Sequence, residues 1–117
     1  IEPLNRRESN IINSVPEGAA LADRVDRASI RALADFYHME EENEPLSNIV
    51  ACKAQLAHVH VADSDRRAPG TGSYPYAEFV QQLRAADYDG MVSIECRWED
   101  FAAEAGPANA FLRQVFA

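Results

Sequence analysis

Short apolar segments recur along this chain at intervals of about 30 residues, the length of one strand–helix unit. The segments are Ile1 to Leu4, Ala32 to Ala34, Leu56 to Ala62 and Met91 to Ile94. The last two are rich in Val and Ile, which is typical of buried strands. Alternating strands and helices predict parallel strands joined by right-handed crossovers. We therefore expect an α/β fold with four βα units, a parallel (βα)4 array, forming one domain over residues 1–117.

Segments with helical periodicity lie between the predicted strands. Residues 15–30 place apolar side chains on one broad stripe, and Pro16 suits the first turn of a helix. Residues 75–88 follow the i, i+3, i+4, i+7 pattern, and Asp89-Gly90 ends that helix. A short helix is expected over residues 45–54. The last helix begins between Phe101 and Pro107 and ends near Phe116.

The charge balance and the cysteine content exclude several classes of protein. The 117 residues include 11 Lys and Arg against 19 Asp and Glu, a net charge of −8. Such an acidic chain is not expected to bind nucleic acid or an anionic membrane surface. No apolar run approaches the roughly 20 residues that a membrane-spanning helix needs. Two cysteines, Cys52 and Cys96, do not form a disulfide framework, so we expect a reducing, cytoplasmic setting.

Side chains that can bind a metal stand at the carboxyl ends of the predicted strands: Glu2, Asp35, His60 and Glu95. The carboxyl ends of parallel strands meet on one face, where α/β proteins build their active sites. Three carboxylates and an imidazole would repel there without a cation. Oxygen-rich ligation with one His suits manganese, magnesium or cobalt. A single Asp or Glu after a strand can instead cap a helix or face solvent. The recurrence in every unit favours the metal site.

Strand alternation orients the histidines. His58 and His60 share one face of their strand, and Val59 and Val61 share the other. If the valines pack under the helices, both imidazoles point toward the axis of a barrel. We expect His58 to be a core histidine one layer below the site. By the same alternation, Ser93 and Glu95 point inward.

Several motifs, in order along the chain, resemble those of the ketose 3-epimerases. The segment Glu2-Pro3-Leu4-Asn5-Arg6-Arg7-Glu8 resembles that family's E-x-x-N-R-x-E, and Asp35-Phe36-Tyr37-His38-Met39 resembles D-x-F-H-M. His58-Val59-His60, Asp65-Arg66-Arg67 and Pro69-Gly70-Thr71-Gly72 together resemble H-x-H…N-R-x-x-P-G-x-G. Ser93-Ile94-Glu95 resembles the end of the last strand. The family belongs to the sugar isomerase/epimerase superfamily, whose members have xylose-isomerase-like TIM barrels.

The resemblance implies a metal-dependent sugar or sugar-phosphate isomerase or epimerase. The chain would supply units five to eight, the C-terminal half of the barrel. One divalent ion (manganese, cobalt or magnesium) would be held by Glu2, Asp35, His60 and Glu95. Glu2 and Glu95 would also be the catalytic pair, transferring a proton next to the ketose carbonyl through a metal-stabilised enediolate. The sugar's oxygens would be bound by Glu8, His38 and Arg66.

Three departures from the family's pattern leave the exact sugar open. Arg7 replaces a usual aromatic residue, Val61-Ala62-Asp63 replaces a Thr-Gly step before the acidic residue, and Cys96-Arg97 follows the last glutamate where Pro is common. A TIM barrel needs eight units. Because this chain opens on a strand-like segment and supplies four units, we expect a homo-oligomer or pairing with a missing N-terminal half. The alternatives are a truncated fragment or assembly module without its own activity, and an inosose dehydratase-like lyase.

Overall fold

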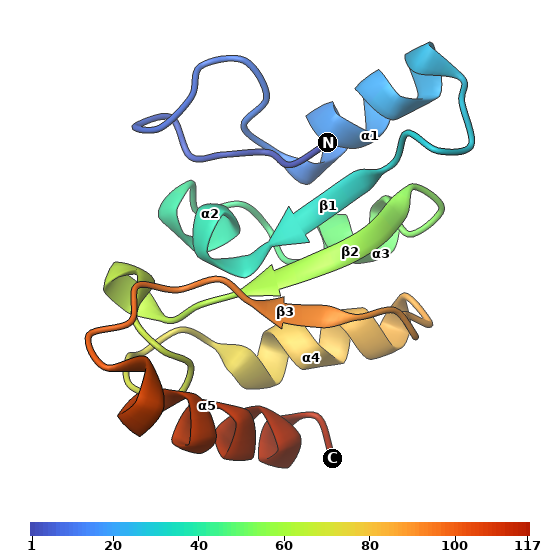
Figure 1. The fold of residues 1–117 in the computed structure, drawn as a ribbon. Helices are drawn as coiled ribbons and strands as arrows, with labels where there is room; N and C mark the ends of the chain where they lie inside the picture. The colour runs from blue at the N-terminus through green and yellow to red at the C-terminus, as the bar shows by residue number, and fades with distance from the viewer.

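The computed structural model describes residues 1–117 and shows a three-stranded parallel sheet covered by helices (Figure 1). The strands are β1 (Ala32–Asp35), β2 (Leu56–Val61) and β3 (Val92–Ile94), in that order across the sheet. The register pairs Asp35 with His60 and Val61 with Ile94. The carboxyl ends of all three strands therefore meet at one edge, and the prediction of a parallel α/β fold is confirmed.

The first predicted strand, Ile1–Leu4, is wrong as a strand, although it lies beside β1. Its carbonyl at Ile1 accepts from the Leu33 N–H at 2.8 Å, as a neighbouring strand would. Pro3 has no N–H to continue a ladder. The N–H of Leu4 donates to Ile12 at 3.0 Å, so the chain turns away from the sheet. The sheet consequently has three strands, with this segment flanking β1.

Helix α1 (Val15–Val25) is shorter than the predicted helix over residues 15–30. Ser14 caps its start by accepting from the Glu17 N–H. At its end, Asp26 has a left-handed backbone and donates its N–H to Ala22. Such a cap stops a helix. The residues that would have extended the stripe lie outside the core, and Ile30 is 38% exposed.

Two short helices follow β1. Helix α2 (Phe36–Glu41) was not predicted, because it begins directly after the strand with Asp35 as its N-cap residue. Helix α3 (Asn48–Ala51) occupies the middle of the segment predicted as helix over residues 45–54. Its first turn follows Ser47, whose side chain makes no capping hydrogen bond.

The last two α-helices agree better with the sequence patterns. Helix α4 (Tyr76–Ala85) lies within the predicted 75–88, and α5 (Phe101–Val115) begins at the early limit predicted and continues through Pro107. Asp100 caps α5 by accepting from the Ala103 N–H. A short 3-10 turn, η1 (Ser64–Arg66), follows β2. Figure 1 shows α3 and α4 behind the sheet and α5 on the far side of β3.

The two faces of β2 have different surroundings. Val59 and Val61 are fully buried in the hydrophobic core beneath the helices, where Phe36 stacks on Phe79 with ring centroids 4.1 Å apart. His58 and His60 point to the other face. The alternation predicted for this strand is confirmed, and it leaves the imidazoles on the face opposite the helices. No helix of the structure combines the length and the apolar composition needed to cross a membrane.

Candidate metal centre

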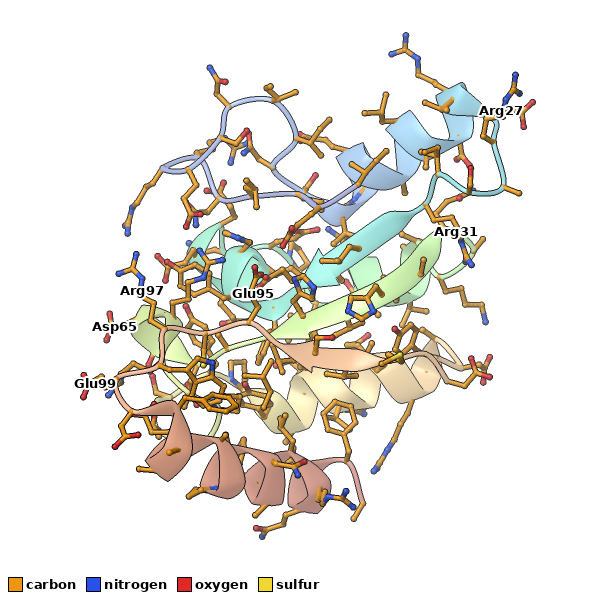
Figure 2. All side chains as sticks on the ribbon, viewed as in Figure 1. Arg27, Arg31, Asp65, Glu95, Arg97 and Glu99 are labelled. Carbon is orange, nitrogen blue, oxygen red and sulfur yellow. The ribbon has the colours of Figure 1, made fainter.

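Four side chains meet at the carboxyl edge of the sheet. Asp35 ends β1, His60 lies near the end of β2, Glu95 directly follows β3, and Glu2 comes from the segment beside β1. One ligand atom from each lies within 4.8 Å of the others. The Glu95 N–H donates to the Val61 carbonyl at 3.0 Å, which extends the β2–β3 ladder to the site. The structure thus brings together the four residues that the spacing singled out (Figure 2 labels Glu95).

The His60 imidazole lies among the three carboxylates. Its Nδ1 is 2.9 Å from Glu95 Oε2, 3.2 Å from Glu2 Oε1 and 3.6 Å from Asp35 Oδ2. The Asp35 carboxylate, 3.6 Å away, raises the pKa of His60 to about 9; burial opposes this rise, and the charges of Glu2 and Glu95 add to it. Without a metal ion, a protonated imidazole is therefore the cation that lies close to all three acids.

Asp35 divides its two oxygens between the fold and the site. Its Oδ1 accepts from the N–H groups of Tyr37 (2.8 Å) and His38 (3.3 Å), which caps α2. Its Oδ2 is buried and has no hydrogen-bond partner. Burial tends to raise the pKa of Asp35, but His60 and His38 hold it below its ordinary value. Asp35 can therefore cap α2 through Oδ1 and still offer Oδ2 to a metal ion.

The other two carboxylates also have unmet bonding capacity. Glu95 Oε2 is buried without a hydrogen-bond partner, although His60 and Arg66 approach it as ion pairs. The pKa of Glu2 is raised by burial and by the charges of Glu95 and Asp35. Buried oxygens without donors and acids that repel each other are both stabilised by a bound cation.

The donor set fits a hard divalent ion. Three carboxylates and one imidazole provide the oxygen-rich ligation that manganese, magnesium and cobalt accept. Ligands at about 2.1 Å from one ion lie at most about 4.2 Å apart. The observed limit of 4.8 Å is close to that value, so small side-chain adjustments suffice for all four residues to share an ion.

Arg66 links this cluster to two further side chains. Its Nη1 donates to both carboxylate oxygens of Glu8 at 3.2 Å, and its Nη2 lies 3.5 Å from Glu95 Oε2. Its guanidinium also lies over the Tyr37 ring, 5.1 Å from the centroid. Both Asp65 and Arg66 have positive φ angles, 61° and 58°. Such backbone costs about 1 kcal/mol or more per residue and is often found at functional sites.

His38 is buried, with its two ring nitrogens in different states. Nδ1 accepts from the Asn5 N–H at 3.1 Å, which means that the proton is on Nε2. Nε2 has no partner in the structure. Asn5 Nδ2 also approaches His38 Nδ1, at 2.9 Å, and donates to Glu8 Oε1 at 3.1 Å. Asn5, which the sequence reasoning assigned no role, therefore orients two of the three residues expected to bind sugar.

Asp63 is a second residue that the sequence reasoning missed. Its buried carboxylate accepts three backbone N–H groups, from Ser64 (2.9 Å), Gly70 (3.0 Å) and Tyr74 (3.1 Å). A Cβ at Gly72 would lie 2.3 Å from Asp63 Oδ1, so only glycine allows this approach. An acidic residue after a strand, followed by a glycine-rich loop, was the available signal. The loop that carries Arg66 is therefore held by one carboxylate.

His58 lies where it was expected. Its Nε2 is 2.9 Å from Ser93 Oγ, and its ring packs edge-on against that of His60. The prediction that His58, Ser93 and Glu95 share a face with His60 is confirmed, and His58 takes its place as a hydrogen-bonded histidine one layer below the cluster.

Comparison with known proteins agrees with this geometry. The family described as xylose isomerase-like TIM barrel matches residues 1–115. The 3-dehydro-D-guloside 4-epimerase of Escherichia coli is 34% identical over 116 residues, which are 97% of this chain and 44% of that protein. The L-ribulose 3-epimerase of Methylomonas sp. is 38% identical over 96 residues, covering 81% of this chain and 34% of that protein.

Solved structures show the same extent of similarity. A D-psicose 3-epimerase crystallised in the presence of D-fructose superposes with a TM-score of 0.90 and 29% identity, covering 99% of this chain and 48% of that one. The chain thus spans less than half the length of the relatives it matches, and its sheet and helices correspond to about half of their fold. It belongs to the xylose isomerase-like TIM barrel family.

Proposed function

We propose that this protein is a divalent-metal-dependent epimerase or isomerase of keto sugars. The observation that carries the proposal is the convergence of Glu2, Asp35, His60 and Glu95 within 4.8 Å, with one buried oxygen each of Asp35 and Glu95 that makes no hydrogen bond. The names of the relatives, which are epimerases of a guloside and of ribulose, support the same class of reaction. The ion would be manganese, cobalt or magnesium.

The four residues would hold the ion, and two of them would also move protons. When bound, the ion supplies Lewis-acid stabilisation of negative charge on the sugar's carbonyl oxygen. Glu2 and Glu95 come from opposite flanks of the sheet, since one lies beside β1 and the other follows β3. One carboxylate takes the proton from the carbon next to the carbonyl, and the other glutamic acid returns a proton to the opposite face. Burial and the charges of Glu95 and Asp35 raise the pKa of Glu2, which is the direction that a proton-donating acid requires.

Three neighbouring side chains are proposed to bind the sugar. His38 presents an unpartnered Nε2–H, which can donate to a sugar oxygen. Arg66 supplies donors beside Glu95, and Glu8 supplies acceptor oxygens beside Arg66. Together they place donors and acceptors next to the two carboxylates that move protons.

The proposal extends to assembly and setting. β3 forms one edge of a sheet that matches about half of its relatives' fold, and the Ile1–Leu4 segment beside β1 forms the other. Unpaired strand edges attract further strands, so we propose that they pair with additional strands of the barrel, from another segment or a second copy. Cys52 and Cys96 are free thiols, which is compatible with the reducing cytoplasm.

Exchange of the substrate's carbon-bound proton with solvent tests the function. The protein is loaded with Mn²⁺ and incubated with a panel of ketoses in D₂O, and deuterium next to the carbonyl is followed by NMR. We expect exchange with at least one ketose, together with formation of its epimer or isomer. Loss of water from the sugar instead would identify a lyase, and no exchange with any ketose would refute the proposal.

Substitutions of Glu2 and Glu95 test their proposed role in proton transfer against a control glutamate on the surface. Glu95→Gln and Glu2→Gln keep an oxygen that can approach the ion but remove the proton-transfer group, so each should lower the rate at least 100-fold. Metal content is measured in each variant to separate lost ligation from lost proton transfer. Glu78→Gln, on the exposed surface of α4, is the matched control and should keep the wild-type rate.

A further inference from the structure

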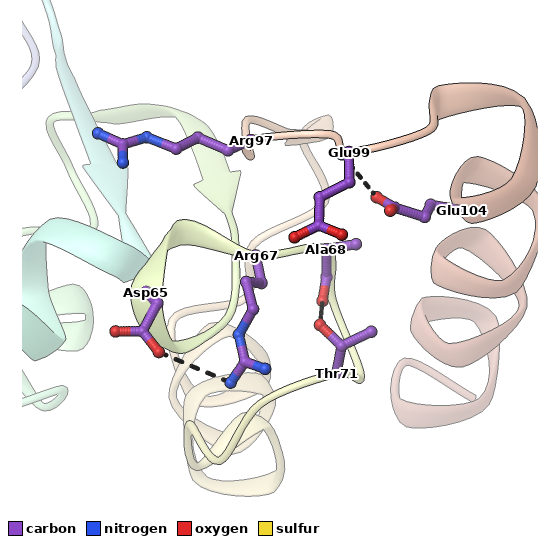
Figure 3. A pocket seen from close by; sticks show the side chains of 7 residues that line it. All are labelled: Asp65, Arg67, Ala68, Thr71, Arg97, Glu99 and Glu104. Carbon is purple, nitrogen blue, oxygen red and sulfur yellow. Dashed lines mark hydrogen bonds and ion pairs between the residues drawn. The ribbon is translucent and has the colours of Figure 1, made fainter.

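Two cavities lie beyond the carboxyl ends of the strands, next to the four-residue cluster but outside it. The larger, about 570 Å³, lies between the loops that follow β2 and β3 (Figure 3). The smaller, about 360 Å³, is bounded by Glu8 and Tyr37, both of which contact Arg66. Volumes of about 300–1,000 Å³ are typical of small-molecule sites. Neither cavity is needed to hold the ion.

Asp65 and Arg97 line both cavities, which therefore adjoin. Both residues flank Arg66: Asp65 precedes it in the chain, and the Arg97 N–H donates to the Arg66 carbonyl at 2.7 Å. Arg66 in turn approaches Glu95. A ligand with its reacting carbons at the cluster can thus extend past Arg66 toward the larger cavity.

The lining of the larger cavity selects a polar, uncharged group. Its residues are Asp65, Arg67, Ala68, Thr71, Arg97, Glu99 and Glu104. Carboxylates outnumber guanidinium groups, so a phosphate would meet net negative charge. Only Ala68 is apolar, so a hydrocarbon group would meet charged side chains. Hydroxyl groups suit both carboxylate acceptors and guanidinium donors.

Two of these side chains are free to bind. Glu104 already accepts from the N–H groups of Glu99 and Asp100, and Arg67 already bonds to Ser64. The Glu99 carboxylate and the Arg97 guanidinium make no hydrogen bond in the structure. Figure 3 shows the Glu99 carboxylate turned toward Ala68, and Arg97 extending away from Glu99.

We propose that the substrate is a glycosylated keto sugar, whose second sugar unit occupies the larger cavity. Glu99 accepts from the hydroxyls of that unit, and Arg97 donates to oxygens at the junction of the two cavities. The inference rests on the proposed function and adds the class of substrate. The sequence left open whether the substrate is a sugar or a sugar phosphate, and this inference favours a neutral glycoside.

Calorimetric titration of the Mn²⁺-loaded protein compares D-fructose with three glucosyl-fructoses, linked through O1, O4 or O6 (trehalulose, maltulose and isomaltulose). We expect at least one disaccharide to bind about tenfold more tightly than fructose, as one or two net hydrogen bonds provide. With diamagnetic Mg²⁺ in place of Mn²⁺, its binding should shift the backbone NMR signals of residues 68–71 and 99. Glu99→Trp fills the cavity and should abolish the preference. Glu78→Trp, the matched control, should retain the preference.

Each other outcome counts against the inference. If fructose binds as tightly as all three disaccharides, or if the preference survives Glu99→Trp, the second sugar does not bind in this cavity. If fructose 6-phosphate binds more tightly than any disaccharide, and Arg97→Ala removes that advantage, the cavity prefers a phosphate group and the inference is wrong. Fructose that binds and exchanges its proton without a disaccharide preference refutes this inference alone. No binding of any keto sugar refutes the proposed function with it.

Discussion

The metal-free protein should lose stability as the pH rises toward 9, because His60 then loses its proton. Carboxylates of Glu95, Glu2 and Asp35 lie 2.9–3.6 Å from its Nδ1, and its pKa is raised from 6.5 to about 9. A raised pKa contributes its full stabilisation below the unfolded-state pKa and none above the folded-state pKa. The contribution is therefore complete below about pH 6.5 and lost above about pH 9. At 1.36 kcal/mol per pKa unit, it amounts to about 3 kcal/mol.

Urea unfolding followed by circular dichroism, with a chelator present, measures this loss between about pH 6.5 and about pH 10. His60→Gln should remove the pH-dependent component, whereas His58→Gln should keep it, because His58 bonds to Ser93 rather than to the acids. Saturating Mn²⁺ should replace the proton and abolish the loss. Manganese affinity should itself rise about tenfold per pH unit up to about pH 9, since the ligand must be neutral.

A pH dependence that is the same in the wild type and in His60→Gln would refute this reasoning. It would mean that the imidazole is not the counter-charge of the three carboxylates. If His58→Gln loses the pH dependence and His60→Gln keeps it, the titrating group is His58 and not His60.

Three further substitutions test single features of the site and its loop. Asp35→Asn keeps an oxygen to cap α2, so above about pH 9, where His60 is neutral, the free energy of unfolding should change by less than about 1 kcal/mol, while calorimetry shows at least tenfold weaker Mn²⁺ binding. Asp63→Asn places an amide against backbone donors and should cost about 1–3 kcal/mol, with faster amide hydrogen exchange around Arg66. Gly70→Ala puts a Cβ 2.7 Å from the Phe111 ring at a φ of +87°, and urea unfolding should show a loss of about 1–3 kcal/mol.

The convergence of the four proposed metal ligands could be predicted because two simple regularities coincide. Side chains alternate along a strand, so His60 and Glu95 had to lie on the face opposite the buried valines. Parallel strands end on the same side, so residues one strand–helix unit apart, such as Asp35 and His60, had to meet. Neither regularity depends on loop conformation, which sequence patterns describe poorly.

Three other features of the fold depend on contacts that hydrophobic periodicity does not indicate. Ile1–Leu4 has the composition of a strand, but Pro3 and the bond from Leu4 to Ile12 end its pairing. Helix α2 was hidden because Asp35, its cap, belongs to the preceding strand. The end of α1 depends on the left-handed backbone of Asp26, a residue type that accepts this conformation without requiring it.

The conformation of the loop after β2, which contributes Arg66 to the site, also could not be predicted from the sequence. Arg66 could be singled out by its motif, but its contacts with Glu8 and Tyr37 depend on a loop shaped by Asp63. That carboxylate organises backbone donors up to eleven residues away, at Tyr74. The acidic residue after the strand and the glycine-rich loop were visible in the sequence, but the N–H groups that the carboxylate accepts were not.

Anomalous diffraction from crystals grown with Mn²⁺, combined with elemental analysis of the same protein, tests the metal centre most directly. We expect one ion per chain, bound by Glu2, Asp35, His60 and Glu95, and its loss in both Glu95→Ala and His60→Ala, which leave no ligand atom at these positions. Glu78→Gln should retain it. A folded protein that binds no ion at millimolar Mn²⁺, or that binds one elsewhere with both variants unaffected, would contradict the assignment of these four residues as a metal site.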